Sequence, residues 1–271
     1  MSRLAIIGGS GFSSMPAMRV ARTQVWSTPY GPTSGPLGFG RLADMDLVFL
    51  PRHGTGHSIP PHKVNYRANI WALKQAGVQR VIGLAAVGGI REDMAPGTLA
   101  IPHQIIDYTH GRAQTFFDGD PSPGHERERG GAGSPLAPVA GLDFDATAVT
   151  HIYFTDPYCE ALRHALLQAA VGLDTPVVPN GTYAAMAGPR LETAMEVRRL
   201  ERDGCDMVGM TGMPEAALAR ELNLCYACCA FVVNWAAGKG ESASLVAEIQ
   251  VNLQHGMEEV QRLLRRFAAR V

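Results

Sequence analysis

The chain contains the run Cys225-Tyr226-Ala227-Cys228-Cys229-Ala230-Phe231-Val232-Val233, and the polar residue Asn234 follows it directly. A continuous apolar run of this length predicts a buried β-strand. In open α/β sheets, ligands bind outside the carboxyl ends of the strands, so Asn234 is a candidate ligand contact. The cysteines of the run could suggest a redox or zinc site. Because no second Cys pair accompanies them, the pattern favours thiols that act as small core side chains.

Working outward from this run, short strands and helices alternate along the chain. Strands are predicted for Leu4–Ile7, Leu47–Leu50, Val78–Ala86 and Met207–Met210, and an extended segment for Leu99–Ile106. Helices are predicted for Val64–Ala76, Asp156–Val171, Thr193–Asp203, Pro214–Glu221 and Ser242–Ala269. We therefore expect one α/β domain over residues 1–271, with a central mixed β-sheet flanked by helices. Residues 119–147, rich in Gly, Pro, Ser, Glu and Arg, are predicted to form a flexible surface loop within it.

Composition excludes several classes of protein. The 271 residues are 46% hydrophobic and carry a net charge of −1, so neither nucleic acid nor a membrane surface is an expected partner. No apolar run approaches the roughly 20 residues of a membrane helix. The first residues are too few for a signal-peptide core, and five cysteines form an odd number. These features predict a cytoplasmic protein with reduced thiols.

Two polar segments follow predicted strands near the start of the chain. In Gly8-Gly9-Ser10-Gly11, glycines would let the backbone approach an anion and Ser10 would add a hydroxyl donor, although an ordinary turn explains the segment equally well. In Arg52-His53, Arg can hold phosphate bidentately and His can add a second donor, although a surface pair is the commoner explanation. Downstream, His57 and His62 lack acidic or Cys partners at ligand spacing, so no metal site is predicted.

Two further segments supply groups for a nucleoside. Thr211 ends a predicted strand, where its hydroxyl can reach phosphate or cap the next helix, and Met210 can pack under a sugar. Glu192, in Gly188-Pro189-Arg190-Leu191-Glu192-Thr193, can accept a hydrogen bond, and the Asn234 amide can donate one. This pair matches the N1–H and O6 groups of a 6-oxopurine. Together with Ser10 and Arg52, it predicts an enzyme that splits a purine nucleoside with phosphate.

These segments together resemble the trimeric purine nucleoside phosphorylase family, most closely its methylthioadenosine phosphorylase branch. The resemblance covers nearly the whole chain outside residues 124–145, and its most specific run is Lys63-Val64-Asn65-Tyr66-Arg67-Ala68-Asn69-Ile70-Trp71-Ala72-Leu73-Lys74. Further matches are Pro96-Gly97, Phe116-Phe117-Asp118-Gly119 and Met210-Thr211-Gly212-Met213-Pro214-Glu215. The resemblance implies a homotrimer that uses inorganic phosphate as a co-substrate and needs no metal or organic cofactor.

The resemblance also assigns roles to individual positions. The phosphate pocket would comprise Ser10, Arg52, His53, Ala85 and Thr211. Ala85 stands where the family often has Thr, so it would offer only its backbone. Met210 would line the ribose, and Leu191 would pack on the base. The other expected substrate-lining residues are Ala86, Val87, Gly88, Val208, Gly209 and Ala236. His151 matches a residue that reaches a neighbouring subunit's site near the 5′ group, and Val246, with Ile249, matches the helix beside the 5′ substituent.

The chain departs from that branch at the base. The adenine-specific branch has Asp at the position of Asn234 and a second Asp two residues on, where this chain has Ala236. Glu192 and Asn234 instead resemble the pair in phosphorylases of inosine and guanosine. An ionised Asp would repel O6, whereas Asn can donate to O6 or N7. A catalytic set of Arg52, His53 and Asn234 is therefore expected to convert methylthioinosine and phosphate to hypoxanthine and 5-methylthioribose 1-phosphate.

Three alternatives remain open. Two are phosphorolysis of methylthioadenosine and phosphorolysis of inosine or guanosine. The third is a nucleoside-binding protein without catalysis. Binding of a purine alone requires neither Arg52 nor His53, so the sequence disfavours this third alternative.

Overall fold

The computed structural model describes residues 3–12, 15–119, 149–240 and 245–270. The loop predicted for residues 119–147 falls outside this part of the chain, except for Gly119. Within the described residues, no helix is long and apolar enough to cross a membrane.

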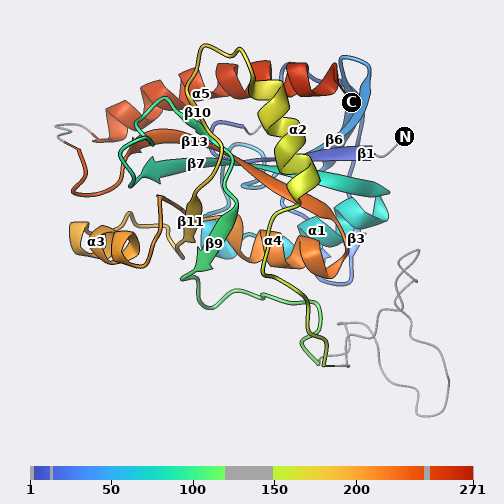
Figure 1. Ribbon diagram of the computed structural model, residues 1–271. Helices are drawn as coiled ribbons and strands as arrows, with labels where there is room; N and C mark the ends of the chain where they lie inside the picture. The colour runs from blue at the N-terminus through green and yellow to red at the C-terminus, as the bar shows by residue number, and fades with distance from the viewer. Residues whose placement is uncertain (1–2, 13–14, 120–148, 241–244, 271) are drawn as a thin grey trace.

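A mixed sheet of 11 strands forms the centre of the described structure (Figure 1). Its strands are β1 (Arg3–Gly8), β2 (Arg19–Gln24), β5 (Leu37–Leu42), β6 (Met45–Pro51), β7 (Val78–Gly89), β8 (Leu99–Ala100), β9 (Gln104–Asp107), β10 (Val177–Val178), β11 (Thr182–Ala185), β12 (Met207–Gly209) and β13 (Cys225–Trp235). The path β13-β7-β1-β6 is parallel throughout, so four strands point their carboxyl ends to the same edge. A separate small sheet pairs β3 (Ser27–Thr28) with β4 (Gly31–Pro32).

Helices cover both faces of the sheet. They are α1 (Tyr66–Gln75), α2 (Glu160–Ala170), α3 (Ala194–Arg202), α4 (Gly212–Glu221) and α5 (Leu245–Ala268), with the 3-10 turn η1 (Pro61–Lys63) before α1. In Figure 1, α2 and α5 lie above the sheet, and α1 and α4 lie below it. Each pair of helices closes a separate hydrophobic core against the sheet.

Strand β13 is apolar throughout because both of its faces are buried. Side chains alternate across a strand, so successive residues meet opposite layers of helices. The odd positions from Ala227 to Val233 pack in the core with α2 and α5, and the even positions from Tyr226 to Val232 pack with α1 and α4. This confirms the predicted strand, which extends two residues further, to Trp235.

The other predicted elements are present, with shifts at their ends that have local causes. Helix α3 begins at Ala194, one residue after the predicted start, because Thr193 is its N-cap and forms a capping box with Glu196. Helix α2 begins at Glu160 instead of Asp156, because the backbone N–H of Cys159 donates to the carbonyl of Tyr226 (2.7 Å) at the edge of β13. The segment predicted as extended divides into β8 and β9.

The prediction of reduced thiols is wrong for Cys159 and Cys225, and the second of these belongs to the apolar run. Cys225 forms a disulfide with Cys159, with the sulfur atoms 2.12 Å apart. This bond joins the beginning of β13 to the residue that precedes α2. Cys228 and Cys229 are free and buried, as predicted. Burial raises the pKa of the Cys229 thiol to about 12, and burial likewise raises that of Cys228, so both behave as apolar core groups.

Candidate active site

A pocket of about 590 Å³ opens at the carboxyl ends of the four parallel strands. The structure brings 15 predicted site residues together around it: Ser10, Arg52, His53, Ala85, Ala86, Val87, Gly88, Leu191, Glu192, Val208, Gly209, Met210, Thr211, Asn234 and Ala236. They come from sequence positions more than 200 residues apart. Their proximity follows from the topology, because each lies at or just beyond the end of a strand, or on a loop that returns to that edge.

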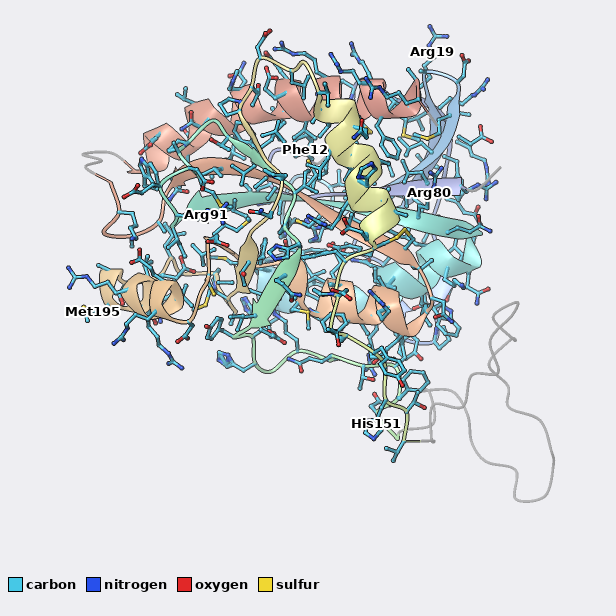
Figure 2. All side chains as sticks on the ribbon, viewed as in Figure 1. Phe12, Arg19, Arg80, Arg91, His151 and Met195 are labelled. Atoms are coloured by element: carbon cyan, nitrogen blue, oxygen red, sulfur yellow. A yellow bond between two sulfur atoms is a disulfide. The ribbon has the colours of Figure 1, made fainter. Side chains whose placement is uncertain are left out.

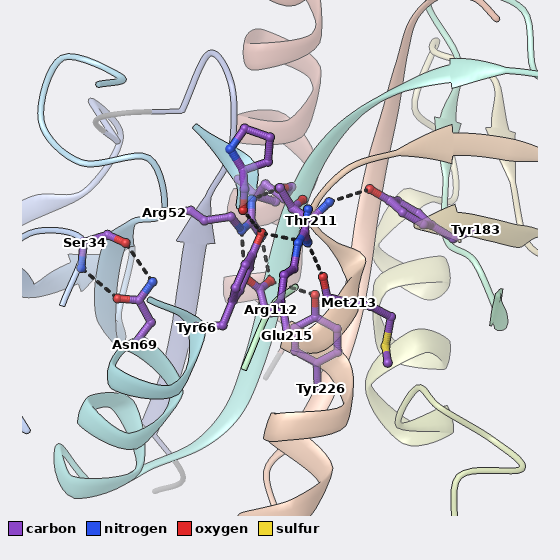
Figure 3. A network of polar contacts seen from close by, with 12 residues as sticks. Ser34, Arg52, Tyr66, Asn69, Arg112, Tyr183, Thr211, Met213, Glu215 and Tyr226 are labelled. Carbon is purple, nitrogen blue, oxygen red and sulfur yellow. Dashed lines mark hydrogen bonds and ion pairs between the residues drawn. The ribbon is translucent and has the colours of Figure 1, made fainter. Parts of the chain in front are cut away.

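A buried ion pair fixes the Arg52 side chain beneath the pocket (Figure 3). Arg52 Nε donates to Glu215 Oε2 and Nη2 donates to Glu215 Oε1, both at 2.7 Å. Nη1 donates to the carbonyl of Leu84 at 2.8 Å, and Tyr226 Oη donates to Glu215 Oε1 at 2.8 Å. Arg52 and Glu215 are each only 1% exposed. Burial disfavours the charged guanidinium, but the Glu215 carboxylate outweighs that effect and raises the pKa of Arg52.

This pairing restricts how Arg52 can meet a ligand. A guanidinium has five N–H groups, and three of them are directed to Glu215 and Leu84. The described residues leave one N–H on Nη1 and one on Nη2 for the pocket. The buried pair is also electrically neutral as a whole. Arg52 is thus able to orient an anion through directed N–H groups, while Glu215 offsets most of its charge.

His53 lies in the same part of the pocket as a neutral ring. Its Nδ1 is 2.8 Å from the carbonyl of Ile59, which can only accept, so Nδ1 carries the proton. Burial and the nearby Arg52 lower the pKa of His53 to about 4. At neutral pH, Nε2 therefore presents a lone pair. The sequence predicted a donor here, but the structure indicates an acceptor.

Thr211 and Met210 lie where β12 passes into α4. Thr211 occupies the N-cap position of α4, but within the described part of the chain its side chain makes no capping hydrogen bond. The capping alternative is therefore not supported, and the hydroxyl lies at the pocket beside Tyr183. Its backbone N–H donates to Tyr183 Oη at 3.4 Å.

Arg112 joins two of the loops that border the pocket. Its guanidinium donates to the carbonyl of Met213 and, at 2.8 Å, to that of Ala187, and it lies 5.4 Å from the centre of the Tyr66 ring. Met213 follows Thr211, and Ala187 precedes the loop that carries Glu192. One side chain thus couples the positions of both loops.

Asn234 and Glu192 contact the pocket from two separate segments of the chain, the end of β13 and the loop before α3. The register of β13 against β7 shifts between Val232 and Asn234, and Asn234 is 7% exposed. Its Nδ2 donates to the carbonyl of Trp235 at 2.6 Å, which leaves a second amide N–H and the Oδ1 acceptor. Glu192 is half-buried, and burial raises the pKa of its carboxyl group. The pocket therefore contains both an amide donor and a carboxyl acceptor.

The apolar wall of the pocket comes from α5 and β13. Ile249 and Leu253 of α5 line it beside Val233. Asn252 Nδ2 donates to the carbonyl of Val233 at 2.8 Å and so fastens the helix to the strand. The predicted 5′ contact Val246 belongs to the first turn of α5, but its side chain lies outside the described part of the chain.

His151 is exposed and does not line the pocket of its own chain. Figure 2 shows it at the lower margin of the molecule, far from Phe12, which ends the Gly-rich turn. Its predicted role in a neighbouring subunit stays a prediction. Among the described residues, no group of three or more His, Cys, Asp or Glu is arranged to hold a metal ion.

Two polar residues of the site have no role predicted from the sequence. One is Glu215, the buried partner of Arg52, although an acid beside the apolar stretch Ala216–Ala219 is a signal for a buried ion pair. The other is His57, for which the sequence raises only a metal site, yet the residue lines the pocket.

Comparison with known proteins extends these observations. The model of the phosphorylase superfamily matches residues 3–269. The probable S-methyl-5′-thioinosine phosphorylase of Pseudomonas syringae pv. tomato is 46% identical over 266 residues, which cover 98% of each chain. The 6-oxopurine nucleoside phosphorylase of Pyrococcus furiosus is 45% identical over 264 residues, covering 97% of this chain and 91% of that one. The structure of methylthioadenosine phosphorylase from Schistosoma mansoni with adenine matches with a TM-score of 0.85 and 31% identity, over 99% of this chain and 91% of that one.

The fold and these similarities define an enzyme of the nucleoside phosphorylase class. The chain belongs to the phosphorylase superfamily. The predicted single α/β domain, with a central mixed sheet between helices, is confirmed by the likeness to the S. mansoni enzyme.

Proposed function

We propose that this enzyme cleaves S-methyl-5′-thioinosine with inorganic phosphate and releases hypoxanthine and 5-methylthioribose 1-phosphate. The observation that carries the proposal is the presence of Glu192 and Asn234 in the pocket that also contains Arg52 and His53. The P. syringae and P. furiosus relatives, whose names specify thioinosine and 6-oxopurine substrates, support the same class of base.

The base is recognised through its hydrogen-bonding edge. The free amide N–H of Asn234 donates to O6 or N7 of the purine, and a Glu192 oxygen accepts from N1–H. Adenine has no N1–H and carries an amine donor at C6, so it leaves both protein groups mismatched. Because unpaired buried polar groups strongly disfavour binding, this pair selects 6-oxopurines.

The phosphate is oriented by Arg52, His53, Ser10 and Thr211. Near neutral pH, inorganic phosphate is a mixture of its dianion and its monoanion. The single hydroxyl of the dianion can donate to His53 Nε2. Its other oxygens accept from the free N–H groups of Arg52 and from the two hydroxyls. Because Glu215 already offsets the charge of Arg52, phosphate keeps its negative charge close to the sugar.

Catalysis follows from this arrangement. The C1′–N9 bond breaks with its electron pair moving to the purine, and a phosphate oxygen bonds to C1′ as cationic character develops on the sugar. Asn234 stabilises the negative charge that builds on the base, which then takes up a proton to give hypoxanthine. Orientation of the nucleophile and stabilisation of the leaving group supply the rate acceleration.

The second candidate function is phosphorolysis of inosine or guanosine, because the P. furiosus relative is named a 6-oxopurine nucleoside phosphorylase. The apolar wall of Val233, Ile249 and Leu253 favours the methylthio substrate. A methylthio group gains free energy when it leaves water for such a surface, whereas a buried 5′-hydroxyl needs a hydrogen-bond partner.

A substrate series tests the proposal. We expect kcat/KM for methylthioinosine to exceed that for inosine by about 10-fold, from burial of the 5′ group, and that for methylthioadenosine by about 100-fold, from the base contacts. Release of each free base is measured at saturating phosphate. Preference for methylthioadenosine would refute the assignment of the base, and equal rates with inosine would refute that of the 5′ group.

We also propose that the active unit is a homotrimer in which His151 of one chain completes the site of the next. The family resemblance suggests this assembly, and the segment around His151 exposes large apolar side chains, with Val149 88% and Tyr153 92% exposed. Apolar surface of this kind is typical of a covered interface.

Dilution tests the assembly. Activity per chain is expected to fall as the protein is diluted through the range in which analytical ultracentrifugation shows trimers giving way to monomers. His151→Ala is expected to alter the rate with methylthioinosine more than the rate with inosine. A fully active monomer would contradict a shared site.

A further inference from the structure

His57 has a backbone conformation that is unusual for its residue type. It follows Gly54 and Gly56, whose φ angles are +74° and +75°, and its own φ is +56°. Residues with a side chain rarely adopt this left-handed region, although His does so more often than most. The turn reverses the chain, so that the imidazole lies back against the pocket instead of pointing away from it.

The ring of His57 meets two proposed phosphate ligands. Its centre is 4.6 Å from that of the His53 ring, and its Nε2 is 3.4 Å from Ser10 Oγ. These are the side-chain partners that the described residues give it. His57 is exposed at the surface, so it contributes little to the core. An unusual backbone conformation that serves no packing role is typical of a functional position.

The proposed phosphate site has few side-chain donors. Arg52 has two free N–H groups, Ser10 and Thr211 have one hydroxyl each, and His53 presents a lone pair. Two atoms 3.4 Å apart, such as His57 Nε2 and Ser10 Oγ, can both contact one oxygen at ordinary hydrogen-bond distances. Burial lowers the pKa of His57, which favours the neutral ring at neutral pH.

We propose that His57 is a phosphate-binding residue, whose Nε2–H donates to the same phosphate oxygen that the Ser10 hydroxyl contacts. The inference rests on the proposed function and extends its phosphate site to the turn Gly54–His57. The left-handed turn then positions the imidazole of His57 to contact the phosphate. The role is specific to phosphate, because His57 contacts no residue assigned to the base.

Two substitutions test the imidazole ring while they preserve the backbone conformation of the turn. His57→Gly accepts the positive φ without strain and removes the ring, so the fold should be retained. His57→Asn also tolerates this conformation and keeps an N–H donor on a shorter side chain. His164→Asn is the matched control, because His164 is exposed on α2 and does not line the pocket.

KM for phosphate is measured with saturating methylthioinosine, and KM for methylthioinosine with saturating phosphate. His57→Gly is expected to raise KM for phosphate by about 10-fold, as for loss of one hydrogen bond to a charged ligand, and to change KM for the nucleoside by less than about 2-fold. His57→Asn should give an intermediate value, and His164→Asn the wild-type value. In calorimetric titration with inorganic phosphate alone, the dissociation constants of the variants should rank in the same order as their KM values for phosphate.

Three results would overturn the inference. The first is an unchanged KM and affinity for phosphate in His57→Gly. The second is an equal rise in both KM values. The third is a lower thermal midpoint that accounts for the loss, measured on the same preparations. Absence of phosphate-dependent turnover in the wild-type enzyme would refute the proposed function itself, whereas wild-type turnover with unaltered His57→Gly kinetics would refute only the role of His57.

Discussion

Arg52→Lys is expected to lower kcat/KM for phosphate by at least about 100-fold. Removal of one oriented hydrogen-bond donor from a reacting anion has an effect of about this size. Lysine keeps the positive charge but cannot make the paired contact to Glu215 or retain directed N–H groups toward the pocket. Affinity for hypoxanthine is expected to stay within about 3-fold, since Arg52 acts on the nucleophile. Steady-state kinetics and calorimetric titration of hypoxanthine measure the two effects.

A charge-free pair controls for stability in that experiment. Single removal of Arg52 or Glu215 leaves a buried charge without its partner, at a cost of about 3–5 kcal/mol. The double variant Arg52→Met, Glu215→Leu removes both charges and should fold with near wild-type stability, while phosphorolysis is lost. Substantial turnover by the double variant would show that the ion pair is structural only.

Asn234→Asp is expected to reverse the preference for the base. The new carboxylate would face O6 of hypoxanthine and would also lose the hydrogen bond to the Trp235 carbonyl, because an ionised carboxylate has no hydrogen to donate. One such mismatch costs about 1–3 kcal/mol, so kcat/KM for methylthioinosine should fall by at least about 5- to 150-fold. The rate with methylthioadenosine should rise, because an acid can accept from its amine.

The control for this change lies at the other end of the same strand. Asn223 is exposed just before β13 and has a φ of +52°, which Asp also tolerates. Asn223→Asp makes the same isosteric change without reaching the pocket and should leave both rates unaltered. If Asn234→Asp preserves the ratio of kcat/KM for methylthioinosine to that for methylthioadenosine, then Asn234 does not determine the preference for the base.

Much of the fold was predictable because burial on two faces leaves a clear signature. An apolar strand such as β13 must be covered on both sides, and the polar Asn234 marks where that cover ends. Strand β2 was not predicted. Its first five residues, Arg19–Thr23, are all exposed, so neither apolar alternation nor a buried run reveals them. Strand β11 has four residues, too few to show a period.

The candidate site was predictable in its membership but not in its chemistry. Residues at strand ends could be collected from the sequence, yet the partner of Arg52 lies 163 positions away. Likewise, the disulfide of Cys159 and Cys225 spans 66 positions. Long-range pairs of this kind arise from topology, which one sequence does not encode locally. The acceptor state of His53 depended on one backbone carbonyl, that of Ile59.

The most direct test follows methylthioinosine and inorganic phosphate by phosphorus NMR while hypoxanthine release is measured in the same sample. We expect one new phosphate ester signal, equimolar with hypoxanthine, and no base release when phosphate is omitted. Hypoxanthine release that does not depend on phosphate, or no turnover of methylthioinosine while methylthioadenosine is consumed, would contradict phosphorolysis of a 6-oxopurine nucleoside.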